Sequence, residues 1–596
     1  MDKIPYEILE LILSHPVLNE NDLVNFGSTC SEFRNVINSS STIWKSKFFQ
    51  RWEKPSSKKI TVDNWMKEFI TRVTIEKKTE EILSEMSQKF YTVIELCDTD
   101  LEYVNEFINS DKYSYYYIVD YLIRLNGAEK PTSLTIKYYG NKLLKYIKQN
   151  HLSQVWLDLI RLEEKYQTLE KSAIFIADWF QTDDESVEDM VIQHLDSAAD
   201  LVKKFLKVQY KDHPLNSVSE ETFIKWKNEN ISGNMFESHH CKQIINCISH
   251  VLLNQLQYYF TPYLDTEICY TIDSAISERR TTPLILGVIY ESVARRLGIR
   301  CEIIFFPAHN LLRWKEEYGN ENSPYHYIDM SGEEMFLSPE CCSRNALVIS
   351  QCPMKKPRFQ YSNMKQVAEK AAHDILNTER MENGINHISD ASILELLLLF
   401  SPMNIEWYRQ LGRYYMRKEM NVIGLIKKMR AISPESLPRE AQKMYEPILS
   451  ALDVYFKNWE ESKSNMVKVK RRTKQIEFAV GMIGRHKIYD YTCVVYGWDP
   501  LCQASQDWII SNGVLDLPHK DQQPFYNVLA HDGTERYVAQ ENLQIIHSPP
   551  LICHPEIGHF FEEYCITYYK PNKQLQDEYP EDASALEKLL RRHTTE

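Results

Sequence analysis

The chain has 596 residues and a mass of 70.4 kDa, too long for one hydrophobic core and long enough for about three to five domains. Hydrophobic residues make up 43% and charged residues 26%, close to the average of globular proteins, so a wholly disordered chain is excluded. Acidic side chains outnumber basic ones by 83 to 69, a net charge of −14. This balance counts against a protein built mainly to hold nucleic acid.

The compartment follows from the termini, the apolar runs and the cysteines. The N-terminal residues show no basic segment leading into an apolar one, as a secretory signal would. The most apolar stretch, residues 393–400, is short and contains Glu395, so no membrane span is expected. The thirteen cysteines are scattered and odd in number, which indicates reduced thiols. We expect a soluble cytoplasmic protein with no cofactor and no membrane partner.

The first fifty residues carry their own helix signals. Pro5 suits the first turn of a helix, and apolar residues recur at helical spacing over residues 8–13. Asn21-Asp22 and Ser41-Thr42 offer two further helix starts. Three short amphipathic helices share too little interior to be stable alone, so we expect their apolar faces to be covered by the rest of the chain or by a partner.

The middle of the chain is mainly helical. Residues 53–154 show a helical pattern with few glycines, whereas residues 155–350 add strand-like segments at 301–306 and 325–329. Residues 360–460 return to helix, with Ser-Pro pairs at 401–402 and 433–434. Their 32-residue spacing is near the period of a helix–turn–helix repeat, although a single period is a weak signal.

The C-terminal part changes character after a basic linker at 461–476. Its run of basic residues, 468–474, indicates either a nuclear-localisation signal, which would add the nucleus as a second compartment, or a solvated linker, and the linker is favoured. Strand patterns at 492–498, 525–529 and 536–538, with Asp532-Gly533 as a hairpin turn, predict a small barrel over 477–568. The tail, 569–596, is charged, and we expect it to be frayed apart from one helix over 583–592.

The N-terminal unit resembles an F-box. Modules of this family dock on the Skp adaptor of cullin–RING ubiquitin ligases, which the resemblance implies here as helix-in-groove recognition. The alternative is an ordinary helical cap. The apolar residues expected to contact the adaptor are Ile4, Pro5, Ile8, Leu9, Ile12, Leu13, Leu23, Phe26, Phe33, Ile43 and Trp44.

Residues 155–350 resemble the SirB-type transglutaminase-like family. The resemblance is carried by the segments 278–286 (ERRTTPLIL), 293–299 (VARRLGI), 307–314 (PAHNLLRW) and 327–329 (YID). Active members use a cysteine at the start of a buried helix, followed by histidine and aspartate on adjacent strands.

The family's nucleophile position falls on Pro283 in this chain, while His309 and Asp329 occupy the other two relay positions. Proline has no nucleophilic atom, so we expect a vestigial relay and no enzyme activity, with His309 and Asp329 serving strand packing. Catalysis would need another nucleophile, and Thr281, Thr282 and Cys301 are the poor substitutes nearby.

Two further patterns occur in the middle of the chain. The histidines and cysteines at 239–241, 247 and 250 could suggest a metal, but their spacing in a helical stretch lacks the paired ligands of structural zinc sites, and no metal is expected. Residues 378–440 resemble the degenerate tetratricopeptide-like segment that accompanies SirB-type domains. Such a segment is either a scaffold or a peptide-binding groove.

The C-terminal barrel resembles the HspQ/YccV-like domain, also called the hemimethylated-DNA-binding domain. The carriers include residues 484–487 (GRHK), 494–500 (VVYGWDP), 521–526 (DQQPFY) and 537–543 (YVAQENL). Residues 477–550 hold four basic and nine acidic side chains, a poor balance for phosphate contacts, so we favour protein or degron recognition over DNA. The candidate ligand-binding residues are Arg485, His486, Lys487, Trp498, Trp508, Phe525 and Tyr526.

The expected fold is multidomain and mostly α with α+β pieces: a three-helix F-box (1–52), a helical region (53–154), a transglutaminase-like α+β domain (155–350), tetratricopeptide-like helices (360–460), the basic linker, the barrel and the tail. These modules in this order resemble F-box proteins that serve as substrate receptors of Skp–cullin–F-box ubiquitin ligases. The resemblance implies three kinds of partner: the Skp adaptor, the cullin–RING scaffold and protein substrates bound for degradation. The alternative function is DNA binding through the barrel.

Overall fold

The computed structural model describes residues 4–52, 61–93, 95–127, 133–181, 187–260, 270–306, 309–320, 323–329, 336–337, 360–383, 391–462, 469–546 and 549–593. The chain divides into two units, each packed around its own interior. The first consists of Met1–Ile147 and Glu460–Glu596, and the second of Lys148–Trp459.

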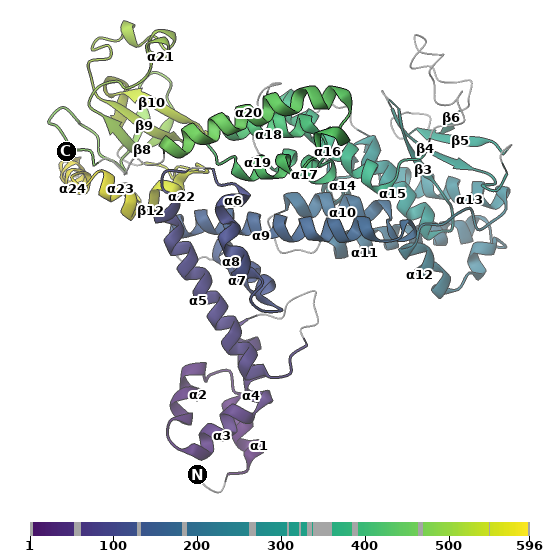
Figure 1. The fold of residues 1–596 in the computed structure, drawn as a ribbon. Helices are drawn as coiled ribbons and strands as arrows, with labels where there is room; N and C mark the ends of the chain where they lie inside the picture. Colours follow the sequence, from purple (N-terminus) through teal and green to yellow (C-terminus); the bar gives the residue numbers. More distant parts are fainter. Residues whose placement is uncertain are drawn as a thin grey trace. The chain divides into compact units, whose positions relative to one another are not determined.

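The first unit begins with four helices where three were expected, and Figure 1 labels them α1 to α4. They are α1 (Tyr6–Leu13), α2 (Glu20–Gly27), α3 (Ser31–Ser39) and α4 (Ser41–Arg51). The expected second helix is broken after Gly27, because Cys30 adopts an extended conformation and its sulfur caps the start of α3 by accepting from the Phe33 amide. Asn19 and Ser40 cap α2 and α4 in the same manner.

A long helix, α5 (Trp65–Phe90), follows the four N-terminal helices and packs against α4. The Trp44 ring lies 5.2 Å from that of Phe69, and Trp52 Nε1 donates to Glu76 Oε1 at 2.7 Å. One hydrophobic cluster therefore continues from Leu9 through α5 into the helices that follow it. Those helices are α6 (Asp98–Leu101), α7 (Asn105–Ile108), α8 (Ser114–Gly127) and α9 (Leu134–Arg161).

The C-terminal part of the first unit contains a five-stranded antiparallel sheet in the order β10-β9-β8-β7-β11. Its strands are β7 (Ile483–His486), β8 (Thr492–Asp499), β9 (Phe525–Ala530), β10 (Glu535–Ala539) and β11 (Leu543–Ile545). The turn between β9 and β10 is made at the predicted Asp532-Gly533, where Gly533 has φ +81°. The segment between β8 and β9 includes the short helix α21 (Gln506–Ser511).

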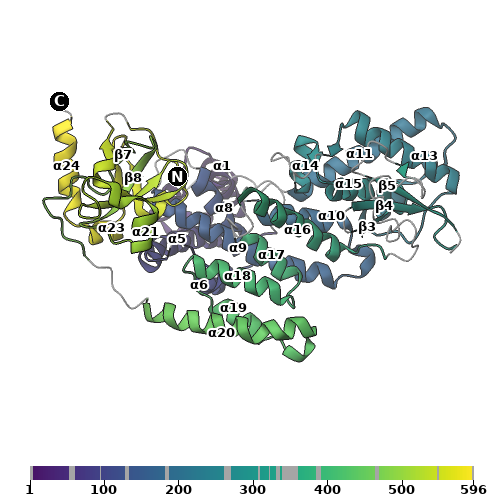
Figure 2. The ribbon, with the colours of Figure 1, turned by 90° about the horizontal axis from the view of Figure 1, so that it is seen from above.

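The C-terminal tail is folded, which corrects the expectation that it is frayed. After α22 (Ile557–Phe560) and β12 (Phe561–Tyr564), the tail forms β13 (Tyr569–Pro571), α23 (Lys573–Glu578) and α24 (Asp582–His593), and Figure 2 shows α23 and α24 beside β7 and β8. The buried Asp582 carboxylate accepts hydrogen bonds from the Val480 amide at 2.8 Å and Trp498 Nε1 at 2.9 Å. These bonds fasten the tail to the barrel.

The basic run is also bound to the barrel rather than free. Lys470 pairs with Asp499 at 2.9 Å and Arg472 with Asp582 at 2.8 Å. The more exposed Arg471 pairs with Glu581 at 3.3 Å. Residues 469–476 therefore belong to the barrel, while residues 463–468 of the expected linker lie outside the described residues.

The second unit places a buried helix, α15 (Pro283–Arg296), against a four-stranded antiparallel sheet in the order β3-β4-β5-β6. All residues of α15 are buried. The strands are β3 (Glu302–Phe306), β4 (His309–Lys315), β5 (Tyr325–Asp329) and β6 (Phe336–Leu337). The surrounding elements are α10 (Leu169–Phe180), α11 (Val187–Gln209), α12 (Glu220–Asn228), α13 (Ser238–Ser249), α14 (Ile272–Glu278), β1 (Tyr259–Phe260) and β2 (Arg280–Thr281).

Five helices complete the second unit, as the helical pattern over 360–460 predicts. They are α16 (Met364–Asn383), α17 (Ser392–Phe400), α18 (Ile405–Arg417), α19 (Ile423–Arg430) and α20 (Arg439–Ser462). The expected fold class is confirmed: mostly helical, with α+β pieces and a small C-terminal sheet domain. Among the described residues, the structure has no helix with the length and apolar character needed to cross a membrane.

Candidate functional site

The eleven residues expected to dock on the Skp adaptor fall into three groups. Exposed residues are Ile4, Pro5, Ile8 and Ile12, and partly buried ones are Phe26 and Phe33, whose rings stack at 4.3 Å. Buried residues are Leu9, Leu13, Leu23, Ile43 and Trp44. In the free chain, only the first two groups offer surface to a partner, and the buried five form the interior that holds the surface in place.

Helix α1 has a buried side that packs in the core and an exposed side that could contact a partner. Leu9 and Leu13, four residues apart, point into the core. Ile8, Leu11 and Ile12 lie on the other side and keep 46%, 72% and 48% of their surface exposed. Leu11 was not among the expected contacts, and neither were Tyr6 and Val17, which are also exposed. The sequence signal that could have identified Leu11 is an apolar residue on the outer side of an amphipathic helix.

Trp44 shows why a sequence match alone misassigns a contact. Its indole Nε1 donates to the carbonyl oxygen of Ile37 at 2.8 Å, and only 4% of the residue is exposed. A partner could not reach this ring without unfolding α4. An effect of Trp44 on docking would act through the fold.

The first position of the expected transglutaminase-like relay falls at the start of α15. Pro283 is the buried first residue of α15, and the Thr282 side chain caps this helix by accepting from the Ile285 amide at 3.3 Å. His309 and Asp329 lie on the neighbouring strands β4 and β5, with Leu311 directly opposite Asp329. The side chains of His309 and Asp329 lie outside the described residues, so their expected packing role stays a prediction.

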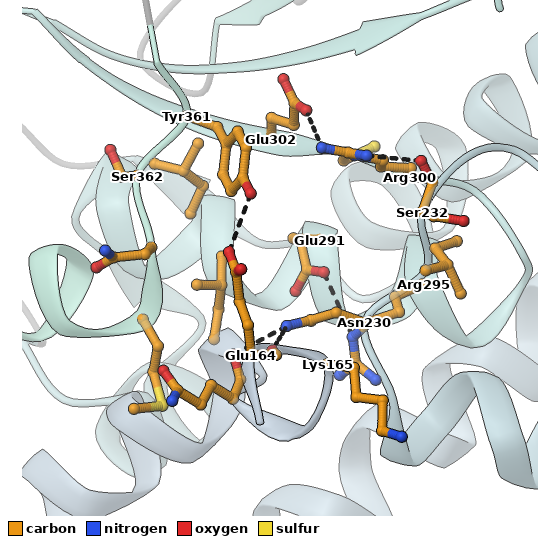
Figure 3. Close-up of a pocket in the computed structure, with 17 residues that line it drawn as sticks. Glu164, Lys165, Asn230, Ser232, Glu291, Arg295, Arg300, Glu302, Tyr361 and Ser362 are labelled. Carbon is orange, nitrogen blue, oxygen red and sulfur yellow. Dashed lines mark hydrogen bonds and ion pairs between the residues drawn. The ribbon is translucent and has the colours of Figure 1, made fainter. Parts of the chain in front are cut away.

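One cavity of this unit lies near the opposite end of α15 (Figure 3). It has a volume of about 310 Å³, and its lining includes Glu291, Arg295 and Cys301. Glu291 is eight residues along the helix from Pro283, which corresponds to about 12 Å. Cys301 is therefore unsuited by position to replace the missing nucleophile.

The chemistry of this cavity also disfavours a reactive thiol. Burial, reinforced by Glu291 and Glu302, raises the pKa of the Cys301 thiol well above its usual value, so the nucleophilic thiolate is scarce at neutral pH. Arg300 donates to Glu302 at 2.7 Å and Arg295 contacts Glu291 at 3.4 Å. The carboxylates of Glu291 and Glu302 thus both have a basic partner.

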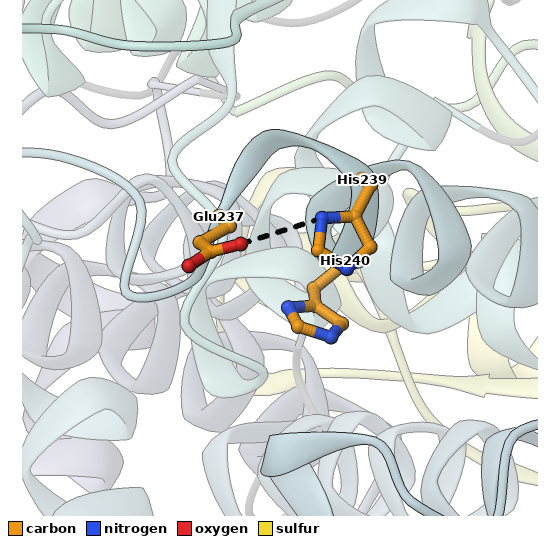
Figure 4. Close-up of side chains that lie close together, drawn as sticks. All are labelled: Glu237, His239 and His240. Carbon is orange, nitrogen blue, oxygen red and sulfur yellow. Dashed lines mark ion pairs between the residues drawn. The ribbon is translucent and has the colours of Figure 1, made fainter.

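The histidine-rich segment brings together fewer donors than its sequence suggests. Glu237, His239 and His240 have ligand atoms within 4.8 Å of one another (Figure 4), and the first two are exposed. Cys241 is buried and its thiol donates to the Phe236 carbonyl oxygen, while burial raises the pKa of Cys247 to about 11. The cysteines therefore do not join the histidines, and three donors beside solvent fall short of a closed tetrahedral site.

The seven candidate residues of the barrel do not form one surface. Trp498 and Tyr526 are fully buried in its core. Arg485 pairs with Asp490, and Lys487 donates to the Glu541 carbonyl oxygen. The expected basic corner is thus occupied by internal contacts, and its middle residue, His486, is buried.

His486, Trp508 and Phe525 do come together, because they line a groove of about 740 Å³. The groove lies between the sheet and the segment that contains α21, and much of its lining is aromatic. Residues that were not expected there are Tyr489, Tyr491, Tyr496, Glu535, Arg536 and Tyr537. Their signal in the sequence was the density of tyrosines flanking the predicted strands.

Three family models match the chain in order. They are F-box-like (residues 1–50), transglutaminase-like superfamily (191–371) and hemimethylated DNA-binding protein YccV like (476–567). "F-box only protein 21" from Pongo abelii is 28% identical over 603 residues, covering 97% of this chain and 92% of the relative. The proteins of the same name from Mus musculus and Homo sapiens are 28% and 27% identical with the same coverage. No solved structure matches the chain.

Proposed function

As a homologue of F-box only protein 21 that carries F-box-like, transglutaminase-like and YccV-like domains, this chain is, we propose, a substrate-recognition subunit of a Skp–cullin–F-box ubiquitin ligase. It docks on the Skp adaptor through its N-terminal helices and presents bound proteins for ubiquitination. The expected cytoplasmic location is compatible with this role and belongs to the same proposal.

The exposed apolar side of α1 carries this proposal. Ile8, Leu11 and Ile12 each leave about half or more of their surface in water, although the helix has a buried side that is large enough to fold it. Burying such side chains in a partner's groove contributes about 1 to 2 kcal/mol each. Three neighbouring residues therefore supply a substantial fraction of a specific interface energy.

The barrel is the part of the chain best placed to read a substrate. Helix α5 packs on α4 at one end, and near its other end Ser87 donates to Gln574 at 2.6 Å and Tyr91 to Glu578 at 2.7 Å. The docking helices and the barrel thus share one packed unit. A substrate held by the barrel would be kept near the ligase at a high effective concentration.

Catalysis is assigned to the partner complex. Pro283 removes the nucleophile from the transglutaminase-like relay, and the thiol of Cys301 is buried with a raised pKa. The transglutaminase-like unit then serves as a scaffold or as a second binding surface. Ubiquitin transfer needs no chemistry from this chain beyond proximity.

DNA binding through the barrel is the weaker alternative. Residues 477–550 carry five more acidic than basic side chains. Arg485, Lys487 and Arg536 are three of their four basic residues and already contact Asp490, Glu541 and Asp532. Duplex binding would show a steep dependence on salt concentration; weak or flat binding at low salt would exclude this function.

The proposal is tested by capture of partners from cell lysate, followed by mass spectrometry. Removing residues 1–50 would expose Phe69 and the apolar side of α5. Point variants are therefore used, because they change the docking surface without exposing this interior. Ile8→Glu with Ile12→Glu should abolish recovery of the Skp adaptor and cullin, whereas Val454→Glu, at a residue 60% exposed on α20, should not. Equal recovery by all three proteins would refute docking through α1.

A further inference from the structure

Strand β10 is an edge strand of the barrel sheet. It pairs with β9 on one side, with Glu535 opposite Leu529 and Ala539 opposite Phe525. Within the part of the chain that the structure describes, no strand pairs with its other side. An open edge presents a row of backbone donors and acceptors that a further strand can use.

The hydrogen-bond pattern shows which groups face the open side. The Ala530 amide donates to the Thr534 carbonyl oxygen at 2.9 Å, so these two residues form a hydrogen-bonded pair. In an antiparallel ladder, such pairs alternate with pairs whose amide and carbonyl groups point outward. By this alternation Glu535, Tyr537 and Ala539 direct their backbone groups away from β9.

The aromatic groove meets this edge and continues from it over the sheet toward β8 and β7. All five residues of β10 line it. Opposite walls come from Tyr491 and Tyr496 and from Trp508 in α21, whose ring lies 5.8 Å from that of Tyr537. The backbone edge at Glu535 and Tyr537, together with the side chains of the groove, is therefore available to one extended segment, whereas Ala539 is 3% exposed and packs with Ile509 and Val514.

The charges of the groove select for a cation. Arg536 pairs with Asp532 and lies 3.9 Å from the centre of the Tyr491 ring, so its charge is compensated. His486 accepts the amides of Ile488 and Tyr489 at Nδ1, and burial lowers its pKa, which keeps the ring neutral. In contrast, the exposed Glu535 carboxylate has the Tyr496 hydroxyl at 3.3 Å and, within the described residues, no basic partner within 4 Å.

We propose that an extended segment of a protein substrate adds to β10 as a further strand and places a lysine or arginine side chain among the groove's aromatic rings beside Glu535. Backbone pairing would supply affinity, and the cation against aromatic faces and a carboxylate would supply specificity. This inference rests on the proposed function as a substrate receptor. It adds the conformation and the chemical class of the recognised segment.

Single-stranded nucleic acid is the other polymer that aromatic grooves hold. Its phosphates would meet the Glu535 carboxylate and the excess of acidic side chains over residues 477–550. The charge of the groove therefore favours a basic peptide. Binding of a single-stranded oligonucleotide is the alternative outcome that the experiment below can detect.

The test uses the full chain and a positional-scanning library of acetylated nine-residue peptides. We expect lysine or arginine to be enriched over aspartate or glutamate at one position, at least fivefold. Glu535→Gln should weaken the selected peptide about tenfold, equivalent to about 1.4 kcal/mol, while Glu563→Gln, an exposed acid on β12, should not. Peptide selection without enrichment of lysine or arginine, or an oligonucleotide that binds more tightly than any peptide, would overturn the proposal.

The strand geometry has its own test. Two peptides are compared, one methylated at the odd-numbered backbone nitrogens and one at the even-numbered nitrogens. One pattern should abolish binding and the other should leave it intact, because a strand directs every second amide toward its neighbour.

Equal tolerance of both methylation patterns would refute strand addition. The Glu535→Gln variant should still recover the Skp adaptor from lysate. Loss of peptide recognition with adaptor recovery intact would thus be separable from failure of the receptor function.

Discussion

The attachment of the C-terminal helix to the barrel is a contact whose energetic consequence can be worked out from the structure. Asp582 is 2% exposed and accepts from the Val480 amide and Trp498 Nε1 while pairing with Arg472. Asp582→Ala leaves these donors without their acceptor and Arg472 without its counter-ion. Removing one partner of a buried ion pair costs about 3 to 5 kcal/mol, and because Arg472 is 14% exposed, we expect the lower end, about 3 kcal/mol.

Hydrogen exchange measured by mass spectrometry can detect this loss locally. A cost of about 3 kcal/mol corresponds to roughly 100-fold faster exchange, since 1.4 kcal/mol is a factor of ten. The faster exchange should appear in peptides of α24 and β8. Glu587→Gln, at an exposed position of the same helix, should leave exchange unchanged. A change below threefold in Asp582→Ala would refute the view that this carboxylate holds the tail to the barrel.

Three further predictions concern other parts of the chain. Burial lowers the pKa of His559 to about 4, so between about pH 6.5 and 4 protons bind the unfolded chain in preference to the folded one. Unfolding measured as a function of pH should therefore show stability lost as the pH falls through this window. The loss should be smaller in His559→Gln. Gly481→Ala should prevent the barrel from folding, because its Cβ would lie 2.2 Å from the Tyr569 carbonyl oxygen at φ +90°; a native circular-dichroism melt would contradict this. Maleimide at pH 7.5 should label the exposed Cys553 rapidly and Cys301 at a negligible rate, and fast labelling of Cys301 would reopen the case for a reactive thiol.

Several elements could be predicted because their signals are local. Strands β8 and β9 follow runs of β-branched and aromatic residues, and the turn at Asp532-Gly533 has the two residues that a tight hairpin favours. Helix α15 was recognisable from apolar residues repeating every four positions. Its proline start also marked the missing nucleophile.

The remaining features depend on contacts between residues far apart in sequence. The tail looked frayed because it is highly charged, yet Asp582 is neutralised by Arg472, more than a hundred residues earlier. The docking residues were chosen by similarity of type, which does not separate the buried Trp44 from the exposed Ile12. The groove beside β10 was hidden for the same reason, since its lining comes from segments spread over residues 486–542.

The proposed receptor function depends on the exposed side of α1, and the affinity of the chain for the adaptor tests this most directly. The measurement is the binding of purified Skp adaptor to the full chain, to Ile12→Glu and to Val454→Glu, by biolayer interferometry. We expect Ile12→Glu to weaken binding at least about 30-fold, or about 2 kcal/mol, with Val454→Glu equal to the unmodified chain. Equal affinities for all three, or no adaptor binding by the unmodified chain, would contradict the account.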